Sequence, residues 1–460
     1  MARTFISGTT PADAIKALTT FRKKNLATTL DQLGEAVVSE PEADAYHKKY
    51  LAILDELVRV ATTWPANPLL DADARGPIPR INLSVKLSSL YSQLDPIDVR
   101  GSEAGIAGRL TELFDRAMAA GAFVNVDMED YRLKDLTLRM FKDLAGSEKY
   151  RGYRHFGIVL QAYLHDTARD LTELEKWARR RGTPVTVRLV KGAYWDYETI
   201  HARQHGWPIP VFSKKVETDA NFEATARQLL DAYPHLEAAF GSHNVRSLSA
   251  AMAYAEALKL PRNSFEIQGL YGMADPLKET LAEEGYRVRV YAPFGELLPG
   301  MAYLVRRLLE NTANESFLRQ GFVEGVSEDT LLAKPASREF ESADSRIESS
   351  GAIFENEPDT AFLLDEERAD FHAALAGVRK HLNKSWPLVI GGKEESGGDG
   401  EIISLNPSQN SEIVGRVAKA SLPQAERAVE AARRAFPVSY THLRAHETKA
   451  NLVCRLLLEK

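Results

Sequence analysis

The chain of 460 residues, 44% of them hydrophobic and 27% charged, is long enough for one large globular domain with additions or for two or three domains. Its 58 basic and 64 acidic residues give a net charge of −6, which excludes the basic surface of a nucleic-acid-binding protein. The single cysteine, Cys454, excludes internal disulfides and cysteine-ligated metals, and no segment reads as an export signal or a membrane span, so we predict a cytoplasmic protein without a metal site.

Short apolar runs alternate along the chain with longer segments of helical period, which is typical of parallel strands joined by crossover helices. Most runs are apolar nearly throughout, as strands buried on both faces are. Eight such strands predict an α/β fold with a closed (β/α)8 barrel, enlarged by a helical insertion between the first two runs. A doubly wound open sheet is the alternative, but no Gly-rich dinucleotide fingerprint follows any run. The eight runs are Leu26–Leu33, Ile81–Leu87, Phe123–Met128, Phe156–Tyr163, Val185–Val190, Leu236–Ser242, Ser264–Leu270 and Val288–Pro293, and the insertion covers Glu40 to Leu70.

Polar side chains stand at the end of nearly every predicted strand or just after it. A barrel of this kind carries its reacting groups at that end. Burying such groups without partners would be costly, so surface decoration explains them poorly. We therefore predict a polar site there, formed by Glu35, Lys86, Asp127, Glu129, Gln161, Arg188, Lys191, His243, Gln268 and Tyr291.

The segment after the last run predicts an apolar helix that carries two adjacent arginines, Arg306 and Arg307. Two neighbouring guanidinium groups repel each other unless an anion lies between them, and arginine holds a carboxylate or phosphate through parallel hydrogen bonds. We predict an anion site; the alternative is two solvated surface arginines. At helical spacing Tyr303, Arg306, Arg307 and Glu310 point toward one side, and Leu304, Leu308 and Leu309 are expected to pack behind them.

The remainder of the chain differs in composition from the barrel. We expect an N-terminal helical segment at residues 1–25, the barrel at 26–322 and a helical linker at 323–385. Residues 386–436 resemble the N-terminal segment of an aldehyde dehydrogenase domain, truncated before its nucleotide fold and its catalytic cysteine. The motifs of this resemblance are Pro387–Lys393, Ser404–Pro407, Glu412–Gly415 and the alanine-rich helix predicted at Pro423–Phe436.

The last segment, residues 437–460, breaks this pattern. Its peptide Val438–Thr448 resembles a translated sequencing adapter, so we interpret the segment as a non-native tail of a protein that is naturally longer and bifunctional. Cys454 lies in this tail, as do His442 and His446, whose i, i+4 spacing alone does not persuade us of a metal site.

Eight segments resemble, in order, the motifs of the FAD-dependent proline dehydrogenases. They are Asn82–Ser88, Val126–Glu129, Leu160–Tyr163, Val187–Asp196, Ser242–Asn244, Phe265–Met273, Tyr291–Pro293 and Tyr303–Asn311. The resemblance runs from residue 26 to about 322. It implies a distorted (β/α)8 barrel with non-covalent FAD over its C-terminal mouth, and the oxidation of L-proline to Δ1-pyrroline-5-carboxylate. It also suggests a quinone as electron acceptor, with peripheral contact at the inner face of the membrane.

The same resemblance assigns roles to single residues. Lys86, Arg306 and Arg307 would bind the proline carboxylate, and Glu35 would pair with Arg306 to close the site over substrate and supply a countercharge when substrate is absent. Asp127 would lie near the amine, either as a base or to position Lys86. Tyr194, Leu270 and Tyr291 would pack the ring against the flavin. The FAD contacts would be Asp127, Gln161, Arg188, Val190, Ala193, Tyr194, Trp195, Ser213, Lys215, Ser242, His243, Gln268, Leu270 and Glu310.

Three other functions stay open from the sequence. A lysine-dependent aldolase would use Lys86 or Lys191 to form a Schiff base. A non-catalytic scaffold would only dock the missing aldehyde dehydrogenase domain. A related cyclic amino acid such as hydroxyproline could replace proline, although Tyr291 is expected to crowd an added hydroxyl.

Overall fold

A computed structural model describes residues 2–312, 331–335 and 357–442 of the chain. The chain divides into two compact units, Met1–Glu367 and Arg368–Lys460, and each is described here by itself.

Eight parallel strands of the first unit close into a barrel, because β1 pairs with β10 on one side and with β4 on the other. The order around the barrel is β1-β10-β9-β8-β7-β6-β5-β4. All eight predicted strands and the closed barrel are confirmed, so the open sheet is wrong. The strands are β1 (Ala27–Gln32), β4 (Asn82–Val85), β5 (Phe123–Val126), β6 (Phe156–Gln161), β7 (Val185–Val190), β8 (Leu236–Gly241), β9 (Phe265–Leu270) and β10 (Val288–Phe294).

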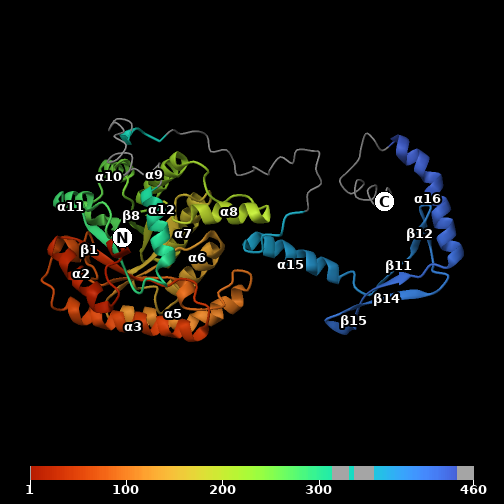
Figure 1. Cartoon of the computed structure of the whole chain (residues 1–460), viewed down its shortest axis with the longest axis horizontal. Helices are drawn as coiled ribbons and strands as arrows, with labels where there is room; N and C mark the ends of the chain where they lie inside the picture. The colour runs from red at the N-terminus through yellow and green to blue at the C-terminus, as the bar shows by residue number, and fades with distance from the viewer. Residues whose placement is uncertain (1, 313–330, 336–356, 443–460) are drawn as a thin grey trace. The chain divides into compact units, whose positions relative to one another are not determined.

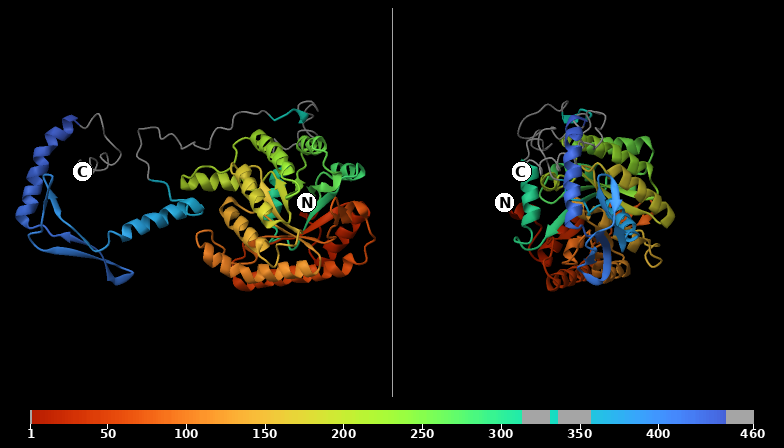
Figure 2. Two further views of the ribbon diagram at one scale, coloured as in Figure 1. Left: turned by 180° about the vertical axis from the view of Figure 1, so that it is seen from behind. Right: turned by 90° about the vertical axis from the view of Figure 1, so that its right-hand side faces the viewer.

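Helices surround the strands of this unit (Figure 1), and the view from behind shows the same ring (Figure 2). The predicted insertion forms α3 and α4, followed by a small hairpin of β2 (Ala72–Asp73) and β3 (Gly76–Pro77). Two short 3-10 turns lie at Leu87–Ser89 and Arg262–Ser264. The helices are α1 (Ala2–Phe5), α2 (Pro11–Lys23), α3 (Glu40–Ala61), α4 (Pro68–Asp71), α5 (Val99–Ala119), α6 (Tyr131–Gly146), α7 (Thr167–Arg181), α8 (Trp195–His205), α9 (Lys215–Asp231), α10 (Val245–Ala257), α11 (Asp275–Glu283) and α12 (Met301–Thr312).

Local sequence signals set where these helices begin and end. Thr10 and Asp13 form a reciprocal capping box at the start of α2, and Pro11 occupies its first turn. Asp130 accepts a hydrogen bond from the Leu133 amide and so caps α6, the helix that follows β5. At the far end of α7 the chain turns through Gly182 at φ +80°, a conformation that favours glycine.

The main hydrophobic core lies between the strands and the ring of helices. Phe114 of α5 stacks on Phe156 of β6 with ring centroids 4.3 Å apart, and both are fully buried. Leu30 and Phe240 contribute to the same core from β1 and β8. Each fully buried side chain of this size stabilises the fold by roughly 1.5–3 kcal/mol, so this layer holds the barrel together.

The interior of the barrel is polar, whereas branched apolar side chains usually fill it. Arg188 of β7 donates to the Ser84 hydroxyl of β4 at 3.1 and 3.2 Å, although β5 and β6 separate these strands in the barrel order. The contact therefore crosses the interior. Nearer the N-terminal ends of the strands, Arg289 binds Glu266 at 2.8 and 2.9 Å. The barrel thus holds charged side chains along its axis, each with an opposite charge beside it.

The second unit has little core of its own. Its strands are β11 (Lys384–Trp386), β12 (Leu388–Ile390), β13 (Lys393–Glu395), β14 (Glu401–Asn406) and β15 (Gln409–Ala418), arranged as a β11-β15-β14 sheet and a β12-β13 hairpin. In the described part of this unit no hydrophobic side chain is buried, and Ile402 and Ile403 of β14 are about half exposed. The sheet does not cover its own apolar side chains.

Several predictions for the C-terminal part fall wholly or partly outside the described residues. Helix α15 (Asp365–Arg379) lies within the predicted linker, but 323–330 and 336–356 are not described. Helix α16 runs from Leu422 to His442 and so continues six residues into the predicted tail. The His442 side chain, His446 and Cys454 lie outside the description. Among the described helices, none is long and apolar enough to cross a bilayer.

Candidate active site

Helix α12 brings the predicted arginine pair to the protein interior. Arg307 is 7% exposed and the Arg306 side chain 15%, so neither is a solvated surface arginine. Leu304 is buried as predicted, but Leu308 and Leu309 are exposed, and the prediction that they pack behind the arginines is wrong. The helix buries the side that carries Tyr303, Leu304 and the arginines, whereas Leu308 and Leu309 are 38% and 51% exposed. The side chain of Glu310 lies outside the description.

Arg306 forms an ion pair with Glu35, which follows β1. Its two terminal nitrogens lie 2.6 and 3.1 Å from the carboxylate oxygens, so the predicted pairing is present. Gly34 permits the sharp turn that directs Glu35 inward, because its φ is +142° and a side chain there would collide with Tyr46. The Arg306 guanidinium also lies over the Tyr194 ring, 4.6 Å from its centre. Arg306 is therefore held by a carboxylate and an aromatic face.

Lys86 directly follows β4 and has Asp31 as its nearest charged partner, at 2.5 Å. Asp127 is farther, with an oxygen 3.9 Å from the ammonium, and the Tyr291 hydroxyl is 3.4 Å away. Sequence reasoning missed Asp31 because it looked for polar residues at strand ends. The available signal was the spacing of Thr29 and Asp31, polar residues two positions apart and therefore on one face of β1.

Asp127, just after β5, connects the centre of the site. It accepts hydrogen bonds from Arg188 at 2.6 Å, from the Tyr291 hydroxyl at 2.8 Å and from the Asn125 amide at 2.9 Å. Arg188 lies over the Tyr291 ring at 5.3 Å. Since these side chains come from β5, β7 and β10, the closed barrel is what brings them together.

The buried charges change one another's ionisation. Burial raises the pKa of Asp31 to about 6, although the Lys86 ammonium opposes this change. Burial tends to lower the pKa of Lys86, but Asp31, Asp127 and Glu35 outweigh it and raise that pKa well above its usual value. Burial also raises the pKa of Glu129 to about 7, helped by the nearby negative charge of Glu35. Lys86 is thus held as an ammonium ion at neutral pH.

We expect Glu129→Gln to weaken the dependence of stability on pH. The pKa of Glu129 is higher in the folded chain than in the unfolded chain, so its contribution is full below pH 4.5 and is lost as pH rises through about 7. The amide cannot ionise and can still bond Ser88, the partner of Glu129. From pH 5 to pH 8 the free energy of unfolding should fall by about 3 kcal/mol less in the variant. Urea unfolding at both pH values measures it.

The same substitution at the exposed Glu256 of α10 serves as the control. An equal loss of stability between the two pH values in wild type and Glu129→Gln would contradict the assignment.

Most of the predicted FAD residues lie on the C-terminal side of the barrel between β6 and β9, in the structure as described, whereas Asp127 follows β5. Gln161 ends β6, and its amide donates to the Glu129 carbonyl at 3.1 Å. Gln268 differs from the others, because it lies within β9 and its amide donates to Glu266, nearer the N-terminal end. The others are Val190 at the end of β7, Ala193 and Tyr194 before α8, Trp195 at its start, Ser213 before α9, Lys215 at its start, Ser242 and His243 after β8, and Leu270 at the end of β9.

Several of the predicted FAD residues contact neighbouring side chains or backbone groups. Lys215 and Lys191 both bind the Asp219 carboxylate of α9, Lys215 at 2.7 Å. His243 accepts a hydrogen bond from the Leu270 amide at 2.9 Å. Ser213 contacts Glu217 at 3.4 Å, and the Trp195 indole donates to the Phe212 carbonyl at 2.8 Å. These contacts order the rim of the barrel.

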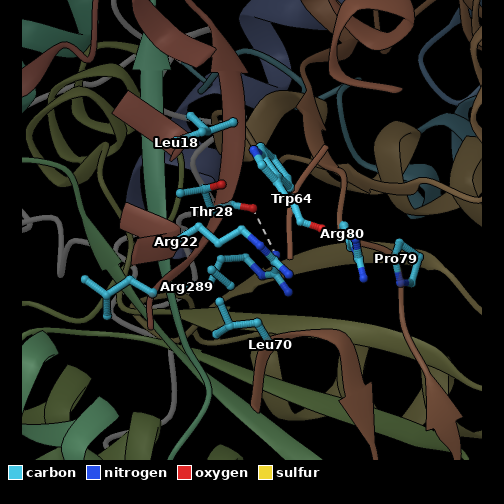
Figure 3. A pocket seen from close by; sticks show the side chains of 10 residues that line it. Leu18, Arg22, Thr28, Trp64, Leu70, Pro79, Arg80 and Arg289 are labelled. Carbon is cyan, nitrogen blue, oxygen red and sulfur yellow. Dashed lines mark hydrogen bonds between the residues drawn. The ribbon is translucent and has the colours of Figure 1, made fainter. Parts of the chain in front are cut away.

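A separate hollow lies at the opposite end of the barrel (Figure 3). It is lined by Arg289 near the start of β10, by Thr28 near the start of β1 and by Arg22 of α2. Arg22 and Arg289 are each paired with a carboxylate, Asp71 and Glu266 respectively. The hollow shares none of the residues predicted for the site.

Comparison with known proteins assigns the family. The profile of the family described as Proline dehydrogenase matches residues 14–320, about two thirds of the chain. The chain belongs to the proline dehydrogenase family. The arginine-bearing helix and the polar barrel mouth lie within the matched residues.

Individual relatives of the chain agree with this family assignment. The chain is 29% identical to the "Proline dehydrogenase" of Deinococcus radiodurans, over 71% of this chain and 91% of that protein. It is 28% identical to the "Bifunctional protein PutA" of Escherichia coli, over 95% of this chain and 34% of that protein. A crystal structure of proline utilization A from Bdellovibrio bacteriovorus, inactivated by N-propargylglycine, is 45% identical with a TM-score of 0.86, over 95% of this chain and 45% of that one. The chain therefore spans about a third of the length of its bifunctional curated relatives.

Proposed function

We propose that this chain oxidises L-proline to Δ1-pyrroline-5-carboxylate, with FAD bound over the C-terminal mouth of the barrel. The observation that carries the proposal is the group of cations at that mouth. Arg306, Arg307 and Lys86 come from α12 and from the residue after β4, and the side chain of each is at least 85% buried. Buried cations at the mouth of the barrel favour an anionic substrate. Since the chain belongs to the proline dehydrogenase family, we take that anion to be the carboxylate of proline.

The proposed binding mode divides the substrate between charged and apolar groups. The arginines and Lys86 hold the carboxylate, each charge-assisted hydrogen bond contributing roughly 1.5–3 kcal/mol. Tyr291 and Leu270 pack against a small apolar cluster that includes Tyr303 and Leu304, next to those cations. A ring of the size of pyrrolidine suits such a surface, and Tyr194 lies alongside through its contact with Arg306. This arrangement fixes both ends of proline.

The residues at the mouth fit FAD. Gln161 Oε1 and Arg188 Nε are buried and have no hydrogen-bond partner in the described structure, so both can bind a polar ring. When bound, FAD supplies the hydride acceptor. We assign Gln161, Arg188, Val190 and Ala193 to the flavin ring, and Trp195, Ser213, Lys215, Ser242, His243 and Glu310 to the rest of the molecule, with contacts from Asp127, Tyr194, Gln268 and Leu270.

In this scheme Asp127 acts by positioning. It holds the Arg188 guanidinium and the Tyr291 hydroxyl directly, whereas its distance to Lys86 is 3.9 Å. Arg188 would hold the flavin ring and would supply a positive charge that stabilises negative charge on it. We also propose, from the resemblance of the sequence, that a quinone receives the electrons during peripheral contact with a membrane. We further propose, from the resemblance of residues 386–436, a second, aldehyde dehydrogenase activity; two relatives of this chain are named "Bifunctional protein PutA".

The aldolase alternative is less well supported. A Schiff base requires a neutral amine, but the surrounding carboxylates raise the pKa of Lys86 well above its usual value. Burial does lower the pKa of Lys191 to about 8, but its ammonium is bonded to Asp219 and to the Ser247 hydroxyl. Family membership likewise favours the dehydrogenase over a non-catalytic scaffold.

An anaerobic visible spectrum of the full chain, supplied with FAD, tests the proposal. We expect flavin absorption bands that bleach when L-proline is added. Pyrrolidine, which has the ring and amine but no carboxylate, should not bleach them at the same concentration. A protein that takes up no flavin, or whose flavin is unchanged by proline, would contradict the proposed function. Equal rates with trans-4-hydroxyproline would instead show that Tyr291 does not restrict the ring.

We expect Glu35→Gln to bind carboxylate ligands more tightly. Glu35 and the substrate carboxylate compete for Arg306, which lies 2.6 Å from Glu35. The uncharged amide competes less, so the dissociation constant of tetrahydrofuran-2-carboxylate should fall by about tenfold, close to 1.4 kcal/mol. Isothermal titration calorimetry of the FAD-loaded protein measures it.

Glu256→Gln, which changes an exposed carboxylate of α10, is the matched control. Weaker binding in Glu35→Gln would mean that Glu35 helps to close the site rather than competing for Arg306.

A further inference from the structure

Asp31 is a buried carboxylate to which the proposed mechanism gives no role. It lies in β1, is fully buried, and places Oδ1 2.5 Å from the Lys86 ammonium. Its register partner in the barrel is Ser84 of β4, two residues before Lys86. The parallel pairing of β1 and β4 therefore sets the two side chains against each other.

The other carboxylate near Lys86 has different partners. Asp127 accepts hydrogen bonds from Arg188 and from the Tyr291 hydroxyl, and it is 3.9 Å from Lys86. Its negative charge is therefore largely balanced by Arg188. Asp31 has no such second cation, and its Oδ2 has no hydrogen-bond partner among the described residues. Among the described residues, Asp31 is therefore the carboxylate that pairs with Lys86 and with no second cation.

The direction of the Lys86 ammonium follows from these contacts. Two of its three N–H groups are directed to Asp31 and to the Tyr291 hydroxyl, in the described part of the chain. The third makes no hydrogen bond among the described residues and is left for a ligand. The ionisable groups that influence Lys86 are Asp31 of β1, Glu35 after β1, Tyr50 of α3, Asp127 and Glu129 after β5, Tyr194 before α8, and Tyr291 of β10.

We propose that Asp31 is a positioning residue that keeps Lys86 charged and directed at the substrate carboxylate. The inference rests on the proposed function, because it takes Lys86 to bind that carboxylate. A buried lysine without a counter-ion readily loses its proton, and a neutral amine binds a carboxylate weakly. Without the Asp31 charge, the remaining nearby carboxylates are Asp127 and Glu35, which are already paired with Arg188 and Arg306.

The test is the pH dependence of ligand binding by Asp31→Asn. Asparagine is nearly isosteric and can still accept a hydrogen bond from Lys86, so that chiefly the charge is removed. Tetrahydrofuran-2-carboxylate is the probe, because it has the ring and carboxylate of proline but no oxidisable amine. We expect its dissociation constant to rise by about tenfold from pH 7 to pH 9 in the variant, beyond any change in wild type. Calorimetry of the FAD-loaded protein measures binding without turnover.

Two further variants separate this role from a merely structural one. Asp31→Asn combined with Lys86→Arg should bind the probe independently of pH, because arginine does not lose its proton in this range. In a Lys86→Met background, Asp31→Asn should have no further effect on binding. A uniform weakening at all pH values, in both backgrounds, would overturn the inference. Unchanged binding in Asp31→Asn would overturn it as well.

The outcomes also distinguish this inference from the proposed function. If wild type does not bind the probe and proline does not bleach its flavin, the proposed function fails and this inference fails with it. If wild type binds the probe and Asp31→Asn behaves identically, only this inference fails. Should Asp31→Asn not fold, Asp31→Ser is the substitute, since the smaller side chain leaves room for a water beside Lys86.

Discussion

We expect the double variant Arg306→Met, Arg307→Met to lower kcat/KM for L-proline by about 10²- to 10⁴-fold. Each arginine offers charge-assisted hydrogen bonds of roughly 1.5–3 kcal/mol to the substrate carboxylate, and each 1.4 kcal/mol is tenfold in affinity. Methionine keeps much of the apolar stem that packs beside Tyr303 and Tyr194. The loss should therefore fall on binding of the carboxylate, and most of it should be an increase in KM. Steady-state kinetics with L-proline measures both parameters.

Two controls make this result specific. Arg180→Met changes an exposed arginine at the end of α7 and should leave kcat/KM unchanged. With pyrrolidine, which lacks the carboxylate, the double variant and wild type should react at similar low rates. If the double variant oxidised proline with unchanged KM, the arginine pair would not be the carboxylate site, and the main support for the proposed function would be gone.

Asp127→Ala should have the largest effect on stability among single substitutions in the site. It removes the only carboxylate bonded to Arg188 in the described structure and leaves a guanidinium that is 4% exposed without its counter-charge. Breaking a buried pair on one side in this way costs about 3–5 kcal/mol. The Tyr291 hydroxyl and the Asn125 amide lose their acceptor as well. We expect the free energy of unfolding, measured in urea, to fall by that amount.

A double-variant cycle checks the physical cause. When Arg188→Met is combined with Asp127→Ala, both charges disappear, so the double variant should be more stable than Asp127→Ala alone. Asp143→Ala at an exposed position of α6 gives the effect of the same substitution on the surface. A double variant less stable than either single variant would mean that the two side chains stabilise the barrel independently.

Much of the barrel could be predicted because its strands are buried on both faces. A nearly continuous apolar run such as that at β6 is typical of a strand in that position, and the helical period between the runs indicates the crossovers. The arginine pair was predictable for a similar reason, since two adjacent cations on an apolar helix require an anion. The packing of the chain around α12 could not be predicted. Leu308 and Leu309 were expected to be buried, but a helix with neighbours mainly on one side leaves its other side exposed.

Asp31 is a residue whose partner could not be predicted from the sequence. The spacing of Thr29 and Asp31 marked a polar face of its strand, but the partner Lys86 could not be predicted because it is 55 residues away along the chain. Likewise, nothing in the sequence indicated that Asp127 would lie closer to Arg188, at 2.6 Å, than to Lys86, at 3.9 Å.

The sequence by itself determined the strands, the closed α/β barrel, the end at which the polar groups gather and the demand for an anion. These depend on the order of apolar and polar residues, which is a local property of the chain. Only the tertiary structure decided which acidic side chain neutralises which basic side chain. Electrostatic attraction between buried groups depends on separations of a few ångströms across the barrel, and those separations are fixed by strand register and closure rather than by spacing along the chain.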